Sequence, residues 1–315
     1  MENIVKHEGK ILLSVILPAY NESKMVNIAA KEIGNILNNE SIEYEIVFVD
    51  DGSKDNTWEN IQKLSDEDNH VVGVHFSRNF GKESAIMAGL ANAKGEACVV
   101  MDCDLQHPPA TIVEMYKLWQ EGYEVVEGVK RSRGKENAVH GLFAKLFYHI
   151  ISKAVGIDML KASDFKLMDR KAVDTLLAMP EKNAFFRALS SWIGYKLAQV
   201  EFDVAERVEG ESKWSTMSLV KYAITNIAAF SSAPMQIVTV LGIILFLFSI
   251  VMTIDTLFNY ISGNAAEGFT TVILVVLFIG SIIMISLGII GYYIAKIYEE
   301  TKGRPKYIIS KVVGK

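Results

Sequence analysis

The sequence has little cysteine: Cys98 and Cys103 are the only two among its 315 residues. An odd separation on one strand places two side chains on opposite faces, so we expect no disulfide between them, and reduced thiols fit the cytoplasm. A block of basic residues is also absent, and the formal net charge is -5. This charge balance gives no support to nucleic acid as a partner.

Two long segments near the carboxyl end, residues 236–258 and 270–295, contain almost no charged residues. As helices rising about 1.5 Å per residue they reach roughly 35 Å and roughly 39 Å, which exceeds the hydrocarbon core of a bilayer, about 30 Å. We therefore predict two tilted membrane spans, with Asp255, near the end of the first, at the interface. The alternative is two buried helices of a large soluble protein, but such helices rarely lack charge for so long.

The connection between the spans, residues 259–269, contains no lysine or arginine, whereas the flanking segments contain both. Positive flanks are typical of the cytoplasmic side, so both termini are expected there. The only apolar run near the amino terminus, 11–17, is too short for a signal peptide. The sequence thus predicts a multi-pass protein of the cell (plasma) membrane with three parts: a cytoplasmic catalytic domain (1–215), an interfacial amphipathic helix or linker (216–233) and a transmembrane hairpin with a cytoplasmic tail (234–315).

Short β-branched runs alternate with helical patterns in the first part of the chain. Strands are expected at 13–17, 45–50, 71–76 and 97–101, and helices at 26–38, 56–66 and 83–93. This alternation predicts an α/β fold with a parallel sheet. Ligands of open α/β sheets bind beyond the carboxyl ends of the strands, so the polar loops there should converge on one crevice. Those loops are 18–23, 51–57 and 102–109.

Beyond Leu105 the alternation is less regular. We expect helices at 110–121 and 137–155 and strands at 124–128 and 165–168, and this half should shape the acceptor side. Apolar residues recur at helical spacing within 137–155, which fits a helix in the membrane interface and fits ordinary core packing equally well.

Two carboxylates, Asp102 and Asp104, stand two residues apart just after the fourth expected strand. Mg²⁺ is commonly held by one or two carboxylates plus substrate phosphates, and hard oxygen ligands also suit Mn²⁺. The pair therefore fits a diphosphate site with Mg²⁺ or Mn²⁺ as the cofactor. Acidic turns are common, so this interpretation depends on context.

Five stretches provide that context, because they resemble in order the inverting family 2 glycosyltransferases, and within them the dolichol-phosphate mannose synthase and bactoprenol glucosyltransferase branch. They are Pro18 to Glu22, Val49 to Thr57, Asp102 to Pro109, Ser163 to Arg170 and Gly210 to Trp214. The resemblance runs from about residue 13 to 315. It implies a Rossmann-like, nucleotide-sugar-binding glycosyltransferase-A domain followed by a pair of transmembrane helices. The motifs are much less specific for the sugar.

The resemblance also implies roles for single residues. The nucleotide-sugar would be held by Pro18, Tyr20, Glu22, Asp51 and Asp102, and the metal by Asp102, Asp104 and Gln106. The acceptor phosphate would be bound by Arg131, Arg133, Arg207 and Lys213. Asp104 and Asp164 are the expected catalytic residues, although Asp164 could equally be a structural hydrogen-bond acceptor.

The turn at Asp51 could also cap the next helix through Ser53 or Asp55, and both interpretations can hold. Lys166 departs from the family pattern, which usually has arginine after Asp-Phe, so a bidentate role there is in doubt. Another departure is Gly81-Lys82-Glu83, where the family often has a histidine-glutamine pair, and no role is assigned to Lys82.

The resemblance implies inverting transfer of a hexose from a nucleotide-sugar to polyprenyl (undecaprenyl) phosphate, for glycosylation of the cell envelope. The acceptor is already anionic, so the enzyme must chiefly position it and stabilise the departing diphosphate. UDP-glucose is the first expectation for the donor, with GDP-mannose, UDP-GlcNAc and UDP-galactose as alternatives. The resemblance is also compatible with a homo-oligomer, since bacterial relatives can be tetramers.

Two rival functions are disfavoured. A processive polysaccharide synthase would need a Gln-x-x-Arg-Trp segment and more spans, and the sequence has neither. A non-catalytic, nucleotide-sugar-binding membrane subunit would not need the intact set of Asp102, Asp104, Arg131 and Lys213.

Overall fold

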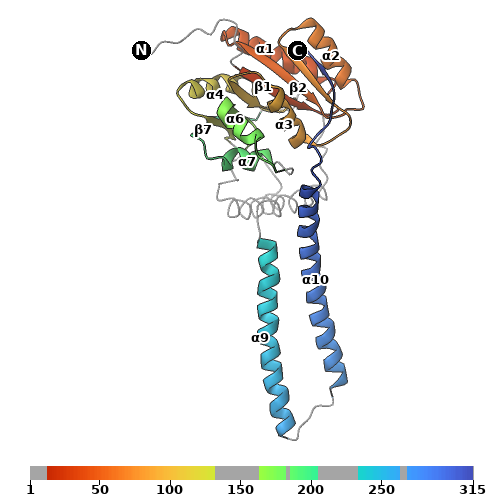
Figure 1. Cartoon of the computed structure of the whole chain (residues 1–315). Coiled ribbons are helices and arrows are strands. Elements are labelled where there is room, and N and C mark those ends of the chain that lie inside the picture. Colours follow the sequence, from red (N-terminus) through yellow and green to blue (C-terminus); the bar gives the residue numbers. More distant parts are fainter. Residues whose placement is uncertain (1–12, 132–162, 182–184, 205–232, 263–267, 315) are drawn as a thin grey trace. The chain divides into compact units, whose positions relative to one another are not determined.

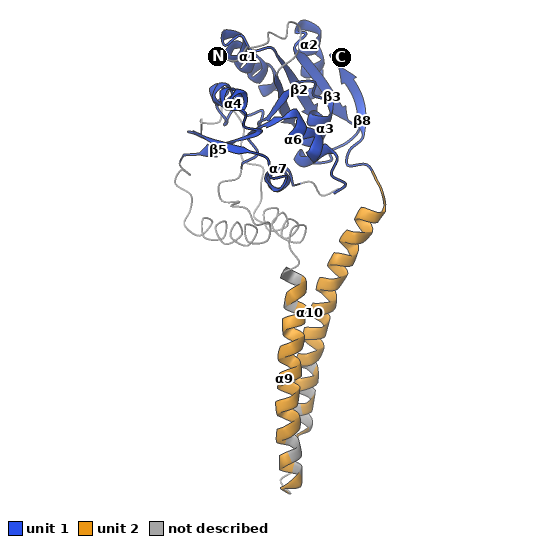
Figure 2. Ribbon diagram, turned by 60° about the vertical axis from the view of Figure 1, so that its left-hand side comes forward, with its two compact units in different colours: residues 1–216, 305–315 blue, residues 217–304 orange. Residues whose placement is uncertain are grey.

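The computed structural model describes residues 13–131, 163–181, 185–204, 233–262 and 268–314. The chain forms two compact units (Figure 2). The first contains Met1–Thr216 together with Pro305–Lys315, and the second contains Met217–Arg304. The expected domain boundary at 215/216 and nearly all of the expected linker, 216–233, lie outside the described residues.

The first unit, in which Figure 1 labels β1, β2 and β7, is built on an eight-stranded sheet with the order β7-β5-β6-β4-β1-β2-β3-β8. Four of its strands are parallel to one another, as the alternation of strands and helices predicts: β1 (Leu13–Ala19), β2 (Tyr44–Asp50), β3 (Val71–Phe76) and β4 (Ala97–Val100). The intervening helices are α1 (Met25–Asn39), α2 (Thr57–Glu67) and α3 (Lys82–Asn92). The expected α/β fold is confirmed, with boundaries shifted by at most two residues.

Both faces of this parallel region are buried, because successive side chains of each strand point to opposite sides. In β2, Ile46 and Phe48 belong to a core cluster with residues of α1, α2 and α4 (Ala110–Gln120), whereas Val47 and Val49 pack with α3. The α3 helix lies very close to the sheet, since a side chain at Gly89 would collide with Ile16. The sheet is therefore a rigid support for the loops at its carboxyl edge.

The rest of the sheet is mixed. Strand β6 (Lys166–Asp169) is antiparallel to both β4 and β5 (Val125–Lys130), and β7 (Leu197–Phe202) is parallel to β5. Two helices, α6 (Arg170–Leu177) and α7 (Phe186–Trp192), follow β6. The expected strands at 124–128 and 165–168 are confirmed with small shifts, and the expected helix at 137–155 lies outside the described residues.

Strand β8 (Ile309–Val313) completes the sheet and has no counterpart among the expected strands. It pairs antiparallel with β3, and an added Cβ at Gly73 would be 2.8 Å from Val313 Cγ2, so the strands meet closely there. Tyr307 stacks on Phe76 with ring centroids 5.2 Å apart. A chain segment that follows the apolar helices thus belongs to the sheet of the first unit.

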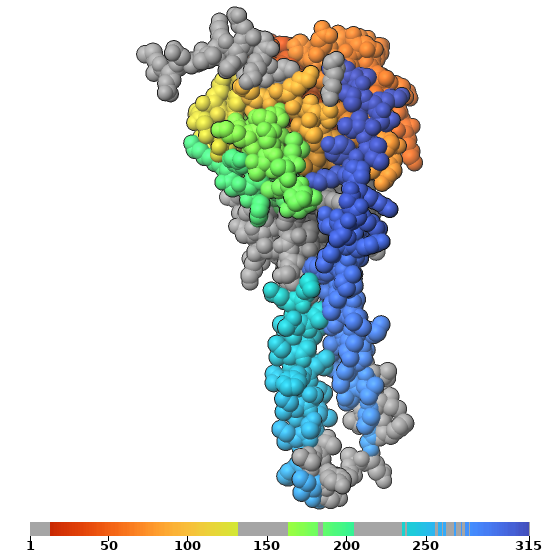
Figure 3. Space-filling model, in the orientation of Figure 1, coloured from red at the N-terminus to blue at the C-terminus, as the bar shows by residue number. Residues whose placement is uncertain are grey.

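In the described part of the second unit the helices are α9 (Ala233–Ile261) and α10 (Phe269–Thr301), which contain the two predicted spans. Their most apolar windows, Val238–Asp255 and Phe278–Thr301, have mean hydropathies of 2.4 and 2.0. Large apolar side chains such as Phe246 and Val251 are exposed along α9 (cyan in Figure 3). By length and composition, both helices are able to cross a membrane.

Ending the chain at Arg304 removes β8 and is expected to destabilise the first unit. The partly buried Tyr307 and Val313 lose their contacts, which costs about 2 kcal/mol and lowers the apparent thermal midpoint by about 4–8 °C. Thermal unfolding of the full and shortened chains in detergent measures the effect. Val312→Ser, at a position exposed on β8, is the control and is expected to change stability by less than about 0.5 kcal/mol. An unchanged midpoint for the shortened chain would contradict a stabilising role for β8.

Candidate active site

The loops that follow β1 and β2 are bonded to each other, as expected for loops at one edge of a parallel sheet. The amide of Asn21 donates to Ser53 Oγ and that of Lys54 donates to Asn21 Oδ1, each at 2.9 Å. The amide of Glu22 donates to Thr57 Oγ1 at 2.9 Å. Pro18, Tyr20 and Glu22 are all half-buried here. The convergence of these two loops is confirmed.

Asp51 joins this pair of loops to the segment before α3. Its buried carboxylate accepts hydrogen bonds from the amides of Phe80 at 2.6 Å and Gly81 at 2.9 Å. Burial raises the pKa of Asp51, and the two amide bonds oppose that rise. Asn56 is the amino-terminal cap residue of α2 and makes no side-chain cap bond, whereas the carboxylate of the preceding Asp55 accepts from the amide of Thr57 at 3.1 Å. Asp51 therefore fixes the backbone that leads into Lys82.

The loop after β4 carries the two carboxylates of the Asp-x-Asp motif, both half-buried. Asp104 Oδ1 accepts from the amide of Gln106 at 3.1 Å, and the amide of Asp102 donates to His107 Nδ1 at 3.4 Å. The buried His107 ring stacks on Phe165 at 4.8 Å, and burial lowers its pKa, which favours the neutral ring that can accept this bond. His107, which the sequence reasoning did not single out, thus anchors the loop.

The donor set of this loop fits a hard divalent cation. Within the described ranges no group of three or more His, Cys, Asp or Glu side chains comes together to hold a metal. Two carboxylates and the side-chain amide oxygen of the neighbouring Gln106 are, however, a ligand set that Mg²⁺ accepts when substrate phosphates and water supply the remaining oxygens. Asp102, Asp104 and Gln106 would therefore supply only part of the coordination sphere of such an ion, and the remaining coordination positions would be open to a diphosphate.

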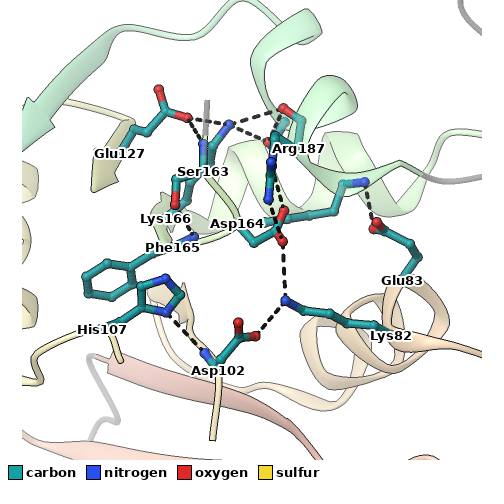
Figure 4. A network of polar contacts seen from close by, with 12 residues as sticks. Lys82, Glu83, Asp102, His107, Glu127, Ser163, Asp164, Phe165, Lys166 and Arg187 are labelled. Atoms are coloured by element: carbon teal, nitrogen blue, oxygen red, sulfur yellow. Dashed lines mark hydrogen bonds and ion pairs between the residues drawn. The ribbon is translucent and has the colours of Figure 1, made fainter. Parts of the chain in front are cut away.

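Asp164, in the loop before β6, is brought to Asp102 by a lysine (Figure 4). Lys82 Nζ lies 2.6 Å from Asp102 Oδ1 and 3.2 Å from Asp164 Oδ2. On the other side of Asp164, Arg187 of α7 forms a two-pronged contact, Nε to Oδ1 at 3.1 Å and Nη2 to Oδ2 at 3.0 Å. Lys82 and Arg187 are functional candidates that the sequence reasoning missed.

These contacts keep the carboxylates ionised. Burial alone would raise the pKa values of Asp102 and Asp164, but Lys82 lowers both and Arg187 lowers that of Asp164 further, so each lies below its ordinary value. Burial alone would lower the pKa of Lys82, but the two carboxylates raise it above its ordinary value. At neutral pH the site therefore contains ionised side chains of both signs.

The neighbouring Glu83 differs from these acids. Burial and the charge of Asp164 raise its pKa to about 7, although its carboxylate accepts the amide of Phe186 at 2.8 Å. Through this bond the first turn of α3 holds the first turn of α7, which carries Arg187. Glu83 thus positions an arginine that contacts Asp164.

Lys166 connects the segments on which Asp164 and Arg187 lie. Its fully buried ammonium lies 3.1 Å from Glu127 Oε1 and donates to the hydroxyls of Ser190 and Ser191, each at 2.8 Å. Glu127 also accepts the amide of Ser163, the residue before Asp164, at 2.9 Å. Burial lowers the pKa of Lys166, although Glu127 opposes this. Lys166 is therefore a structural cation in this arrangement, bonded to strand β5 and to helix α7.

Of the four residues expected to bind the acceptor phosphate, only Arg131 lies within the described residues. Arg131 follows β5 and is exposed, with Nη1 3.0 Å from Asp203 and Nε 3.5 Å from Glu201. The structure thus pairs Arg131 with acids of the β7 end. The other three, Arg133, Arg207 and Lys213, lie outside the described residues.

Glu127→Gln is expected to destabilise the protein strongly, because it leaves the buried Lys166 ammonium without its counter-ion. Removing one partner of a buried ion pair costs about 3–5 kcal/mol, which corresponds to a fall of the apparent thermal midpoint on the order of 10 °C. Combining Glu127→Gln with Lys166→Met removes both charges and should recover most of the loss. Thermal unfolding of the single and double variants in detergent tests this, and a single variant as stable as the parent would contradict it.

Comparison with known proteins agrees with the fold and the motifs. The model of the family described as Glycosyl transferase family 2 matches residues 14–177. CsbB of Bacillus subtilis is 40% identical over 95% of this chain and 92% of its own length. The bactoprenol glucosyl transferase of Shigella phage SfII is 36% identical, over 95% of this chain and 97% of its own. A solved structure of glucosyl-3-phosphoglycerate synthase from Mycobacterium tuberculosis aligns with a TM-score of 0.49 and 20% identity, covering 71% of this chain and 79% of that one. The chain belongs to glycosyl transferase family 2 and is a glycosyltransferase.

Proposed function

We propose that this glycosyltransferase transfers glucose from UDP-glucose to undecaprenyl phosphate, with inversion at the anomeric carbon, at the cytoplasmic face of the cell membrane. One observation carries the proposal: the similarity to a bactoprenol glucosyl transferase extends over 95% of the chain, through the site and through both apolar helices. A polyprenyl acceptor stays in the bilayer, so a membrane hairpin in the same chain would keep the enzyme where its acceptor is.

The pairing of β8 with β3 supports the proposed topology. Residues before α9 and residues after α10 contribute to one sheet, so both ends of the hairpin would lie on the same side if α9 and α10 cross a membrane. With lysine and arginine in the flanking segments, that side is proposed to be the cytoplasm. The connection at 259–269 would then face the opposite side.

The nucleotide is proposed to bind against the joined loops after β1 and β2. Pro18, Tyr20 and Glu22 are half-buried there, so each retains surface for a ligand. Asp51 uses one lone pair on each oxygen for Phe80 and Gly81, and a carboxylate oxygen has a second lone pair that can accept a donor of the base or ribose. A structural and a binding role of Asp51 are thus compatible.

Mg²⁺ or Mn²⁺ would be held by Asp102, Asp104 and Gln106 together with the donor diphosphate. When bound, the ion supplies positive charge that stabilises the departing diphosphate. The residues of the chain keep their own tasks: Asp102 and Asp104 would hold the cation that binds the diphosphate, and the bond from the Gln106 backbone amide to Asp104 fixes the direction of that carboxylate. This fixed geometry lowers the cost of positioning the donor.

Asp164 is proposed to contact the reacting centre. Its ionised carboxylate is held by Arg187 and Lys82, so it can stabilise positive charge that develops at the anomeric carbon. The acceptor phosphate is already anionic and needs no strong base. It is proposed to be bound by Arg131, Arg133, Arg207 and Lys213.

A donor panel tests the proposed function. Purified protein in detergent with Mg²⁺ and undecaprenyl phosphate should form a radiolabelled glycolipid from UDP-glucose and at least tenfold less from GDP-mannose, UDP-GlcNAc or UDP-galactose. Asp104→Asn is the matched variant: it keeps the shape of a proposed metal ligand and removes its charge, so transfer should be abolished with the fold intact. Preference for another donor would refute the assignment of glucose, and label released only into water, with none in lipid, would refute the acceptor class.

Arg131→Ala tests the proposed acceptor site. We expect it to raise the acceptor KM or to lower transfer 10–100-fold, which corresponds to about 1.5–3 kcal/mol for a charge-assisted contact. UDP binding, measured separately by calorimetry, should stay unchanged. If Arg131 serves only its exposed ion pairs with Asp203 and Glu201, the loss will stay within about 1 kcal/mol. Equal weakening of UDP binding would also contradict the acceptor role.

A further inference from the structure

The ammonium of Lys82 lies between the carboxylates of Asp102 and Asp164. Its ammonium is within 3.2 Å of both Asp102 and Asp164, and no other side chain of the described residues forms an ion pair with Asp102 at comparable range. Asp164 is in a different position, since Arg187 already contacts both of its oxygens. Loss of Lys82 would therefore remove the ion-pair partner of Asp102, whereas Asp164 would keep its contact with Arg187.

The side chain of Lys82 is able to move. It is 40% exposed, and Lys82 is the first residue of α3, so only its flexible stem connects the ammonium to the rigid helix. The preceding Gly81 has φ of 98° and its amide is bound by Asp51, which fixes the backbone at this point. A fixed backbone with a long, flexible cation at its end suits a group that exchanges partners.

The ammonium and a divalent cation would compete for Asp102. A metal ion on this carboxylate would lie close to Lys82 Nζ, which is only 2.6 Å from Asp102 Oδ1, and like charges at such range repel each other. A nucleoside diphosphate offers a new partner, because its phosphate oxygens accept hydrogen bonds from an ammonium. The amino-terminal end of α3 also favours an anion near Lys82.

We propose that Lys82 exchanges partners when the donor binds. In the nucleotide-free enzyme its ammonium pairs with Asp102 at the place that the metal ion would occupy. With metal and nucleoside diphosphate bound, the ammonium contacts the diphosphate. Arg187 keeps Asp164 in place during the exchange. This inference rests on the proposed function, in which Asp102 is a metal ligand. Lys82 is then a positioning residue in the free enzyme and a diphosphate-binding residue in the complex.

The exchange makes metal and nucleotide binding interdependent. Metal alone must displace Lys82 from Asp102, so the free enzyme binds metal weakly. Once the diphosphate accepts the ammonium, that competition ends, and metal affinity rises. Because linkage is reciprocal, metal must raise the affinity for the diphosphate by the same factor.

Lys82→Met tests the proposal through opposite changes in two affinities. Mn²⁺ binding to the full chain in detergent, followed by electron paramagnetic resonance of the free ion, should become about tenfold tighter in the absence of nucleotide, a factor within the usual range of coupling. UDP binding at saturating Mn²⁺, measured by calorimetry, should become about tenfold weaker. Lys82→Arg retains the charge and should resemble the parent in both measurements. Lys63→Met, at an exposed position on α2, removes the same charge away from the site and should change neither affinity.

Each alternative outcome is informative. If a folded Lys82→Met protein binds Mn²⁺ as the parent does or more weakly, the competition does not exist and the proposal fails. If Mn²⁺ binding tightens but UDP binding is unchanged, the ammonium does not move to the diphosphate, and the exchange fails. Asp104→Asn separates these failures from failure of the proposed function: if it leaves Mn²⁺ binding of the parent unchanged, the metal lies elsewhere and both proposals fall. Lys82→Gln, a polar replacement, serves if the methionine variant does not fold.

Discussion

The ammonium of Lys166 has no exposed surface, so its charge has to be neutralised and fully hydrogen-bonded inside the protein. This requirement brings three segments together: β5 through Glu127, the loop before β6 through the amide of Ser163 on Glu127, and α7 through two serine hydroxyls. Asp164 follows Ser163, and Arg187 lies in the first turn of α7. The contact between Asp164 and Arg187 therefore depends on the neighbouring buried pair of Lys166 and Glu127.

The two halves of the site are supported in different ways. The half formed by the loops after β1, β2 and β4 rests on a parallel sheet with both faces buried, and its loops are joined mainly by bonds to backbone amides. The half that contains Asp164 rests on side-chain ion pairs and on an antiparallel strand. Lys82 connects the halves across the space between Asp102 and Asp164. A ligand that binds to one half can therefore act on the other through one flexible side chain.

The sequence predicts the first half of the molecule well and the second half less completely. Runs such as Val71–Phe76 are apolar and β-branched because both of their faces are buried, and this leaves a clear signal in the chain. The Asp102-x-Asp104 motif follows such a strand directly, so its place at the edge of the sheet could be inferred. The pairing of Lys82 with Asp164 could not, because it joins residues far apart in sequence and depends on how α3 and the β6 loop pack. Strand β8 was missed for a similar reason: its residues are largely exposed and their pairing with β3 follows from tertiary structure alone.

The position of β8 in the chain has a consequence for biosynthesis. The outer edge of β3 receives its partner only from residues that are translated after both apolar helices. While the ribosome makes α9 and α10, the nascent sheet has an open edge of unpaired amides and carbonyls, a state that is prone to wrong pairing. If only one of the two helices crossed the bilayer, β8 would lie on the side of the membrane opposite to β3. The outer edge of β3 would then stay unpaired. Under the proposed topology, the sheet is therefore completed only when residues 309–313 lie on the same side of the membrane as β3.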